Sequence, residues 1–178
     1  RRMIDRAFGP GITPRGQSRE NRQGGVVYLQ EYFADVREWR MVRIGRSFFG
    51  YRKEKGGGEF HSASKTGSWL DPPRALLDLT REVTDCGKFT SMNVDVFETT
   101  DGRLLVNELQ TVFGATTPAD QLRVNGIAGR YVLEEGAWRF DAGPYSAHAC
   151  ANLRVRYLVE DLLSLRLPES EWVGQCRR

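Results

Sequence analysis

Hydrophobic and polar residues alternate along several short stretches of the chain, which is the pattern of half-buried β-strands. Alternation and an excess of β-branched and aromatic side chains predict strands over residues 26–33, 38–45, 47–52, 91–98, 103–110, 131–133 and 138–140. Short turns, such as residues 45–47 and the Asp101-Gly102 turn, separate neighbouring strands. Turns this tight join antiparallel strands, so the pattern predicts a series of hairpins.

Two further stretches have the spacing of amphipathic helices. The first opens with Asp71-Pro72-Pro73 and ends at Gly87, which fits the tolerance of proline in a first helical turn and of glycine after the last. The second spans about residues 147–165 and carries apolar side chains on one face, at Leu153, Tyr157, Leu158, Leu162 and Leu165. We therefore expect the α+β class, with an antiparallel β-sheet and helices packed on one face.

Length and composition are those of one globular domain: the chain has 178 residues, 40% of them apolar and 28% charged. Residues 1–25 are rich in glycine and arginine and are predicted as a flexible lead-in to a domain over residues 26–178. No apolar run is long enough to span a bilayer, no secretory leader is visible, and Cys86, Cys150 and Cys176 lack the spacing of a zinc site. These features predict a cytoplasmic protein without a membrane partner.

The basic residues are mostly arginine, 22 of 26, although the net charge is only +3. The planar guanidinium suits phosphate and carboxylate groups, and a general bias toward arginine explains the same count. Six arginines fall within the first 22 residues, but stacking aromatic residues are not interleaved with them and no nucleic-acid motif follows. The composition therefore does not favour a nucleic-acid partner.

Three oxygen-bearing side chains lie on the predicted hairpin of residues 91–110. Glu108 and Gln110 are two residues apart and share one face, and a turn centred between Asp101 and Gly102 sets Asp95 opposite Glu108. Two adjacent carboxylates repel unless a cation lies between them, and hard oxygen ligands of this kind suit Mg²⁺. A solvated polar face on an amphipathic hairpin explains the same residues, and the spacing alone leaves both interpretations open.

These residues belong to an ordered series of short motifs, at residues 28–33, 38–40, 51–52, 94–96, 101–102 and 106–110. The series resembles the ATP-grasp superfamily, in particular its carboxylate–amine ligases, over about residues 26–115. The resemblance implies that the chain is the C-terminal subdomain of such an enzyme. It also implies that Gln30, Glu31 and Phe33 belong to a hinge strand that holds adenine, and that Glu38 accepts the ribose hydroxyls. An exposed surface acid is the alternative for Glu31.

The resemblance further implies that Asp95, Glu108 and Gln110 bind Mg²⁺ between the β- and γ-phosphates of ATP. Arg52 is the implied catalytic residue, which meets phosphate or the developing acyl-phosphate charge, with a surface ion pair as its alternative. The expected cofactors are ATP and Mg²⁺, and the expected partners are a nucleotide and a small carboxylate substrate.

The expected function is that of part of an ATP- and Mg²⁺-dependent carboxylate–amine ligase that acts through an acyl phosphate, once the preceding half of the fold is supplied. A truncated or non-catalytic nucleotide-binding domain and an ATP-grasp metabolite kinase are the alternatives. Since such enzymes clamp nucleotide between two subdomains, apolar surface left uncovered predicts self-association, with a homodimer as the expected partner.

Overall fold

The computed structural model describes residues 29–54, 67–68, 70–111, 113, 122–146 and 150–164. The chain divides into two compact units, Arg1–Ala34 and Asp35–Arg178. In the first unit, residues 29–33 form no strand, so the prediction of a strand over residues 26–33 is wrong for them. Leu29 and Tyr32 are 87% and 69% exposed, which shows that no neighbouring strand buries their apolar side chains. Residues 26–28 and the predicted lead-in, residues 1–25, lie outside the described residues.

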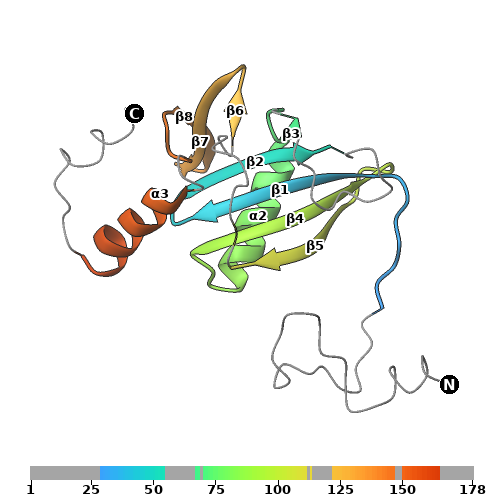
Figure 1. The fold of residues 1–178 in the computed structure, drawn as a ribbon, viewed down its shortest axis with the longest axis horizontal. Coiled ribbons are helices and arrows are strands. Elements are labelled where there is room, and N and C mark those ends of the chain that lie inside the picture. Colours follow the sequence, from blue (N-terminus) through green and yellow to red (C-terminus); the bar gives the residue numbers. More distant parts are fainter. Residues whose placement is uncertain are drawn as a thin grey trace, which may run out of the picture. The chain divides into compact units, whose positions relative to one another are not determined.

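Among the described residues of the second unit, eight strands form one sheet, drawn in Figure 1. The strands are β1 (Val36–Ile44), β2 (Ser47–Lys53), β3 (Gly67–Ser68), β4 (Ser91–Thr99), β5 (Leu104–Gln110), β6 (Arg123–Val124), β7 (Ile127–Glu134) and β8 (Ala137–Ala142). The main order is β5-β4-β1-β2-β7-β6, with β3 paired to β2 and β8 paired to β7. All the pairings are antiparallel, which confirms the predicted hairpins β1–β2, β4–β5 and β7–β8.

Helix α2 (Arg74–Cys86) packs on one face of the sheet, behind β1 and β4 in Figure 1. Its apolar side holds Leu76 and Leu77, both fully buried. On its last turn, Thr84 accepts a 2.8 Å hydrogen bond from Arg43 of β1, and Asp85 forms an ion pair with the same guanidinium. The predicted helix is confirmed, and it ends at Gly87 as expected.

A second helical segment consists of α3 (Ala151–Arg156) and the π-helix η3 (Tyr157–Leu162). It lies at the end of the sheet beside the β1–β2 turn (Figure 1), where Gly45 has a φ of +55° and leaves room for the ring of Tyr157. Leu153 and Tyr157 pack against the core, whereas Leu158 and Leu162 are 47% and 54% exposed. The predicted helix is confirmed over residues 151–162, but only the first part of its apolar face is covered, and Leu165 lies outside the described residues.

The core fills the centre of the sheet on both faces. β4 is buried at five successive positions, residues 92–96, and Met41, Val42 and Phe49 of the neighbouring hairpin are fully buried. A strand buried on both sides normally carries apolar residues throughout. β4 instead carries Asn93 and Asp95 among its buried residues, so polar groups lie inside this sheet and require partners. In the part of the chain that the structure describes, no helix is long and apolar enough to cross a membrane.

Candidate functional site

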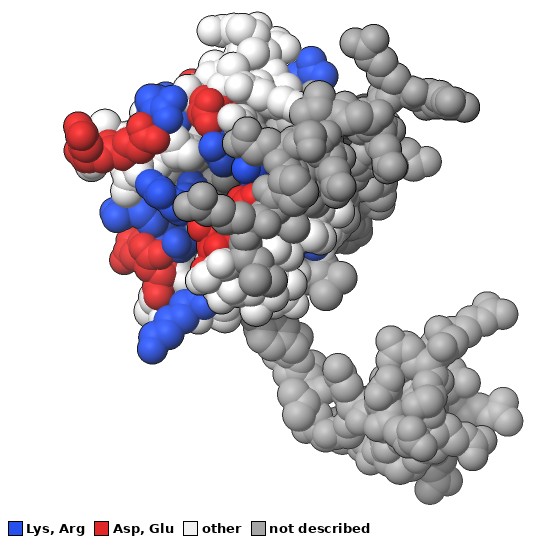
Figure 2. Space-filling model, turned by 90° about the vertical axis from the view of Figure 1, so that its left-hand side faces the viewer, with Lys and Arg blue, Asp and Glu red and all other residues white. Residues whose placement is uncertain are grey.

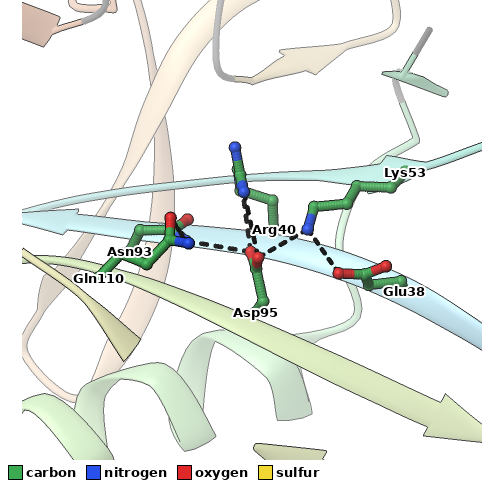
Figure 3. Close-up of polar contacts among 6 residues, drawn as sticks. All are labelled: Glu38, Arg40, Lys53, Asn93, Asp95 and Gln110. Atoms are coloured by element: carbon green, nitrogen blue, oxygen red, sulfur yellow. Dashed lines mark hydrogen bonds and ion pairs between the residues drawn. The ribbon is translucent and has the colours of Figure 1, made fainter. Parts of the chain in front are cut away.

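A charged cluster lies on the face of the sheet opposite α2. Because Arg43 contacts α2 and strand side chains alternate, Arg40 points to the other face. The register sets Asp95 beside Arg40 and pairs Glu38 with Lys53. We call Glu38, Arg40, Lys53 and Asp95 the charged cluster; Figure 3 shows their side chains directed toward one another.

The carboxylate of Asp95 is the centre of this cluster. Its Oδ1 accepts hydrogen bonds from Arg40 Nε and from Asn93 Nδ2, both at 3.1 Å. Its Oδ2 accepts from Arg40 Nη2 at 3.1 Å and from Lys53 Nζ at 2.6 Å. A carboxylate offers about four acceptor positions. Asp95 therefore has every acceptor position filled.

Lys53 links the two acidic residues of the charged cluster. Its Nζ lies 2.6 Å from Asp95 Oδ2 and 2.5 Å from Glu38 Oε1. Glu38 is 5% exposed and Asp95 1% exposed, so both carboxylates are held away from water and both need a cation. Two acidic and two basic side chains leave the cluster neutral. The implied contact of Glu38 with ribose is untested, and in this structure its carboxylate holds Lys53.

Opposing effects set the ionisation of Asp95. Burial pushes the pKa of its carboxyl upward, but the bonds from Arg40 and Lys53 outweigh burial and hold that pKa below its ordinary value. For Arg40, burial lowers the pKa, and its bonds to Asp95 raise it above the ordinary value. Both groups are therefore charged at neutral pH, as an ion pair requires.

An unsatisfied amide oxygen lies next to the charged cluster. Asn93 is fully buried, and its Nδ2 donates to Asp95 Oδ1 and, at 3.3 Å, to Gln110 Oε1. Its Oδ1 is buried, and no hydrogen-bond donor from the described residues reaches it. A buried acceptor without a donor or cation is costly, which makes this oxygen a free ligand position at the site.

The structure confirms the predicted pairing of Asp95 with Glu108 across β4 and β5, and pairs Asn93 with Gln110. The four side chains share one face because paired residues and residues two apart point the same way. Glu108 is exposed, and within the described ranges its carboxylate has no ion pair. No group of three His, Cys, Asp or Glu side chains among the described residues is placed to hold a metal.

The residues nevertheless fit a hard divalent cation in kind. Asp95 and Glu108 would supply carboxylate oxygens, Gln110 an amide oxygen, and Asn93 its unpartnered one, all ligands that Mg²⁺ accepts. The obstacle is the occupancy of Asp95 by two basic side chains. The metal role of Asp95, Glu108 and Gln110 stays a prediction.

Arg52 lies apart from this group. Arg52 pairs with Trp39 between β1 and β2, whereas the preceding residue, Tyr51, pairs with Arg40. Because side chains alternate along a strand, Arg52 points to the face opposite Asp95. Its guanidinium bonds to Glu54 at 2.8 and 3.1 Å, which is the ion-pair alternative recognised in the sequence. The structure does not bring Arg52 together with Asp95, and its catalytic role stays a prediction.

The residues expected to bind adenine belong to the first compact unit. Gln30 and Glu31 are exposed and Phe33 is half-buried, in a segment without strand structure. The exposure of Glu31 agrees with the surface role left open for it. The adenine contacts of Gln30, Glu31 and Phe33 stay predictions.

The sequence interpretation overlooked Arg40, Lys53 and Asn93. A signal in the sequence could have identified Lys53. Counting outward from a β1–β2 turn at Gly45 and Arg46 places Glu38 opposite Lys53, just as counting from the β4–β5 turn placed Asp95 opposite Glu108. The Arg40–Asp95 contact had no local signal, since β1 and β4 are separated by β2 and α2 in the chain.

Comparison with family models, curated proteins and solved structures finds no match for this chain.

Proposed function

We propose that this chain forms the nucleotide- and Mg²⁺-binding part of an ATP-dependent carboxylate–amine ligase. The observation that carries the proposal is the pairing of Asp95 with Glu108 across one hairpin, with the basic side chains of Arg40 and Lys53 bonded to Asp95. Acidic oxygens next to two cations are the complement of a metal–polyphosphate, which carries both signs of charge. The ordered motifs that resemble ATP-grasp ligases support the same conclusion.

In the proposed reaction, a substrate carboxylate attacks the γ-phosphorus of ATP, and ADP leaves. The resulting acyl phosphate is attacked by an amine, which expels inorganic phosphate and forms an amide. Asp95, Glu108 and Gln110 would hold Mg²⁺, which would supply neutralisation of the negative charge of the polyphosphate. Phosphoryl transfer needs mainly positioning and electrostatic stabilisation from the protein.

The chain's own residues have distinct parts in this proposal. Asp95, Glu108 and Gln110 would hold the cation, and Asn93 Oδ1 would lie within the same group of oxygens. Arg40 and Lys53 would take phosphate oxygens, because they are basic residues bonded directly to Asp95. ATP is abundant in the cytoplasm, which is the location we propose.

Glu108→Gln tests the metal role. The substitution removes a carboxylate charge from an exposed side chain that makes no ion pair among the described residues, so the fold should be unaffected. We expect MgATP binding, measured by isothermal titration calorimetry, to weaken by about 10- to 100-fold, since carboxylates are the stronger Mg²⁺ ligands.

Glu82→Gln is the matched control, because Glu82 is an exposed acid on α2, on the other side of the sheet. It should leave MgATP binding unchanged. Equal affinity of the wild-type protein and Glu108→Gln would refute the metal role. With the complementary half of the fold present, release of free phosphate together with an amide supports a ligase, whereas a phosphorylated metabolite identifies a kinase.

A further inference from the structure

We infer that Lys53 and Arg40 occupy the carboxylate of Asp95 in place of a metal ion, so that a divalent metal and a polyphosphate bind only together. Without ligand, the two basic side chains occupy the carboxylate; a polyphosphate draws them away and frees Asp95 for the metal. The inference rests on the proposed function insofar as it takes Asp95 and Glu108 as metal ligands. It adds how access to that site is controlled.

The first support is the complete occupancy of Asp95. Two donors reach each of its oxygens: Arg40 Nε and Asn93 Nδ2 at Oδ1, and Arg40 Nη2 and Lys53 Nζ at Oδ2. A metal can bind this carboxylate only by displacing a donor. Since Asn93 is fully buried, the donors able to leave are those of Lys53 and Arg40.

The second support is the charge balance. Glu38 and Asp95 are matched by Arg40 and Lys53, so among the described residues only the charge of Glu108 is uncompensated at the proposed metal site, and one negative charge attracts a divalent cation weakly. A divalent metal arriving alone would also be repelled by an ammonium and a guanidinium a few ångströms from its site. A polyphosphate that pairs with these two cations removes the repulsion and leaves the carboxylates in excess.

The third support is that the two basic side chains are more exposed to solvent than the carboxylate they hold. The side chains of Arg40 and Lys53 are 21% and 11% exposed, whereas that of Asp95 is 1% exposed. An incoming anion therefore reaches the cations before a metal reaches the carboxylate. Lys53 has Glu38 as a second acceptor and a flexible stem, so it can leave Asp95 without losing every partner.

The test measures metal binding with and without an anion, on the whole chain. Mn²⁺ replaces Mg²⁺ as the probe, and protein-bound Mn²⁺ is followed by water-proton relaxation, with protein-free blanks to correct for chelation. We expect Mn²⁺ to bind about 100-fold more tightly in the presence of inorganic tripolyphosphate than alone, a coupling at the strong end of those common in proteins. By reciprocity, Mn²⁺ should tighten tripolyphosphate binding by the same factor.

Lys53→Met removes the positive charge that occupies Asp95 and keeps the approximate length of the side chain. It should bind Mn²⁺ without tripolyphosphate at least about 10-fold more tightly than the wild-type protein, so that the coupling shrinks. Lys88→Met is the matched control at an exposed lysine after α2 and should keep the wild-type coupling. Lys53→Arg, which retains the charge, should keep it as well and serves if Lys53→Met does not fold.

The outcomes separate this inference from the proposed function. Mn²⁺ that binds the wild-type protein equally well with and without tripolyphosphate overturns the inference, while MgATP binding and ligase turnover could still be observed. Coupled binding of Mn²⁺ and tripolyphosphate without any ligase product supports the inference and counts against the ligase. Loss of coupling in Lys88→Met as well as Lys53→Met would overturn the assignment to Lys53.

Discussion

At the scale of single residues, Asp95 shows how an ionised group can be kept inside a sheet. Burial of a lone carboxylate is expensive, and the attraction of a buried ion pair roughly offsets that cost when the geometry is good. Arg40, Lys53 and Asn93 provide that geometry, with four hydrogen bonds between 2.6 and 3.1 Å. The net gain in stability is therefore small, but removal of one member leaves the others unpaired.

Asp95→Asn should accordingly destabilise the protein by about 3 kcal/mol, since it leaves two basic side chains beside a neutral amide. Chemical denaturation with urea, followed by circular dichroism, measures the change. Asp161→Asn, at an exposed acid of η3, is the control and should change the free energy of unfolding by less than about 0.5 kcal/mol. Equal effects of the two substitutions would contradict the structural importance of the cluster.

The residue-level prediction succeeded where contacts are local in sequence. Asp95 and Glu108 lie in one hairpin, and counting from a turn centred between Asp101 and Gly102 paired them correctly, although the register next to the turn differs from that count by one residue. Arg40 meets Asp95 only because β1 and β4 pair, and 55 residues separate the two side chains. Alternation gives the faces of each strand but not which strand lies beside it, which is why Arg40 was missed. The pairing of Lys53 with Glu38 could have been counted across the β1–β2 turn.

At the scale of elements, an irregularity in β4–β5 shapes the candidate site. Near the turn Val96 pairs with Val106, and the register shifts before Asp95 pairs with Glu108, so the return strand contains one extra residue, Asn107. A bulge of this kind bends an edge strand and re-aims its side chains. If the strand had no bulge, Asp95 would pair with Asn107 instead of Glu108, and the two carboxylates would not face each other.

The packing of α2 gives an element-scale prediction. Leu77 is fully buried between the helix and the sheet, whereas Leu158 of η3 is 47% exposed. Leu77→Ala should lower the free energy of unfolding by about 3 to 4 kcal/mol, because it removes buried methyl groups and leaves a cavity. Leu158→Ala, with the same chemical change, should cost less than about 1 kcal/mol. Thermal or urea unfolding of both variants makes the comparison, and similar losses would show that η3 is packed more tightly than the exposure of Leu158 indicates.

Most elements with strong local signals were predicted well, with one hairpin and one strand as exceptions. β1, β2, α2, β4 and β5 follow the expected ranges closely. The short β6–β7 hairpin was missed although Asn125-Gly126 is a favoured turn sequence, and both residues have positive φ values, 52° and 80°. The strand predicted at residues 29–33 failed because propensity alone does not supply a partner strand.

At the scale of the whole molecule, exposed apolar residues bear on the expected self-association. The helical segment formed by α3 and η3, together with the residue that follows it, exposes Val155, Leu158, Leu162 and Leu163, each between 47% and 56%. Apolar surface gathered on one segment favours association. We expect sedimentation velocity to show a concentration-dependent dimer, weakened in Leu158→Glu/Leu162→Glu. A wild-type protein that stays monomeric at high micromolar concentration would contradict this expectation.

The stability of the whole molecule should also depend on pH through Asp95. Its pKa is lowered in the folded state by Arg40 and Lys53 against the effect of burial. The folded form therefore binds the proton less readily than the unfolded form, in which an aspartate has a pKa of about 4. The contribution is therefore complete above about pH 5 and is lost as the pH falls through the folded-state pKa. Asp141 acts in the same direction: burial raises its pKa, but bonds from Tyr145 and Arg130 lower it overall.

We expect the urea midpoint of the wild-type protein to be nearly constant from pH 7 to 5 and to fall below that range, because protonation of Asp95 breaks the charged cluster. In Asp95→Asn the midpoint should be lower at pH 7 and should fall less steeply with acid, since the remaining slope comes from other carboxyls such as Asp141. Parallel curves for the two proteins would mean that Asp95 titrates alike in the folded and unfolded states. The ion pairs at the centre of the sheet would then not hold its charge.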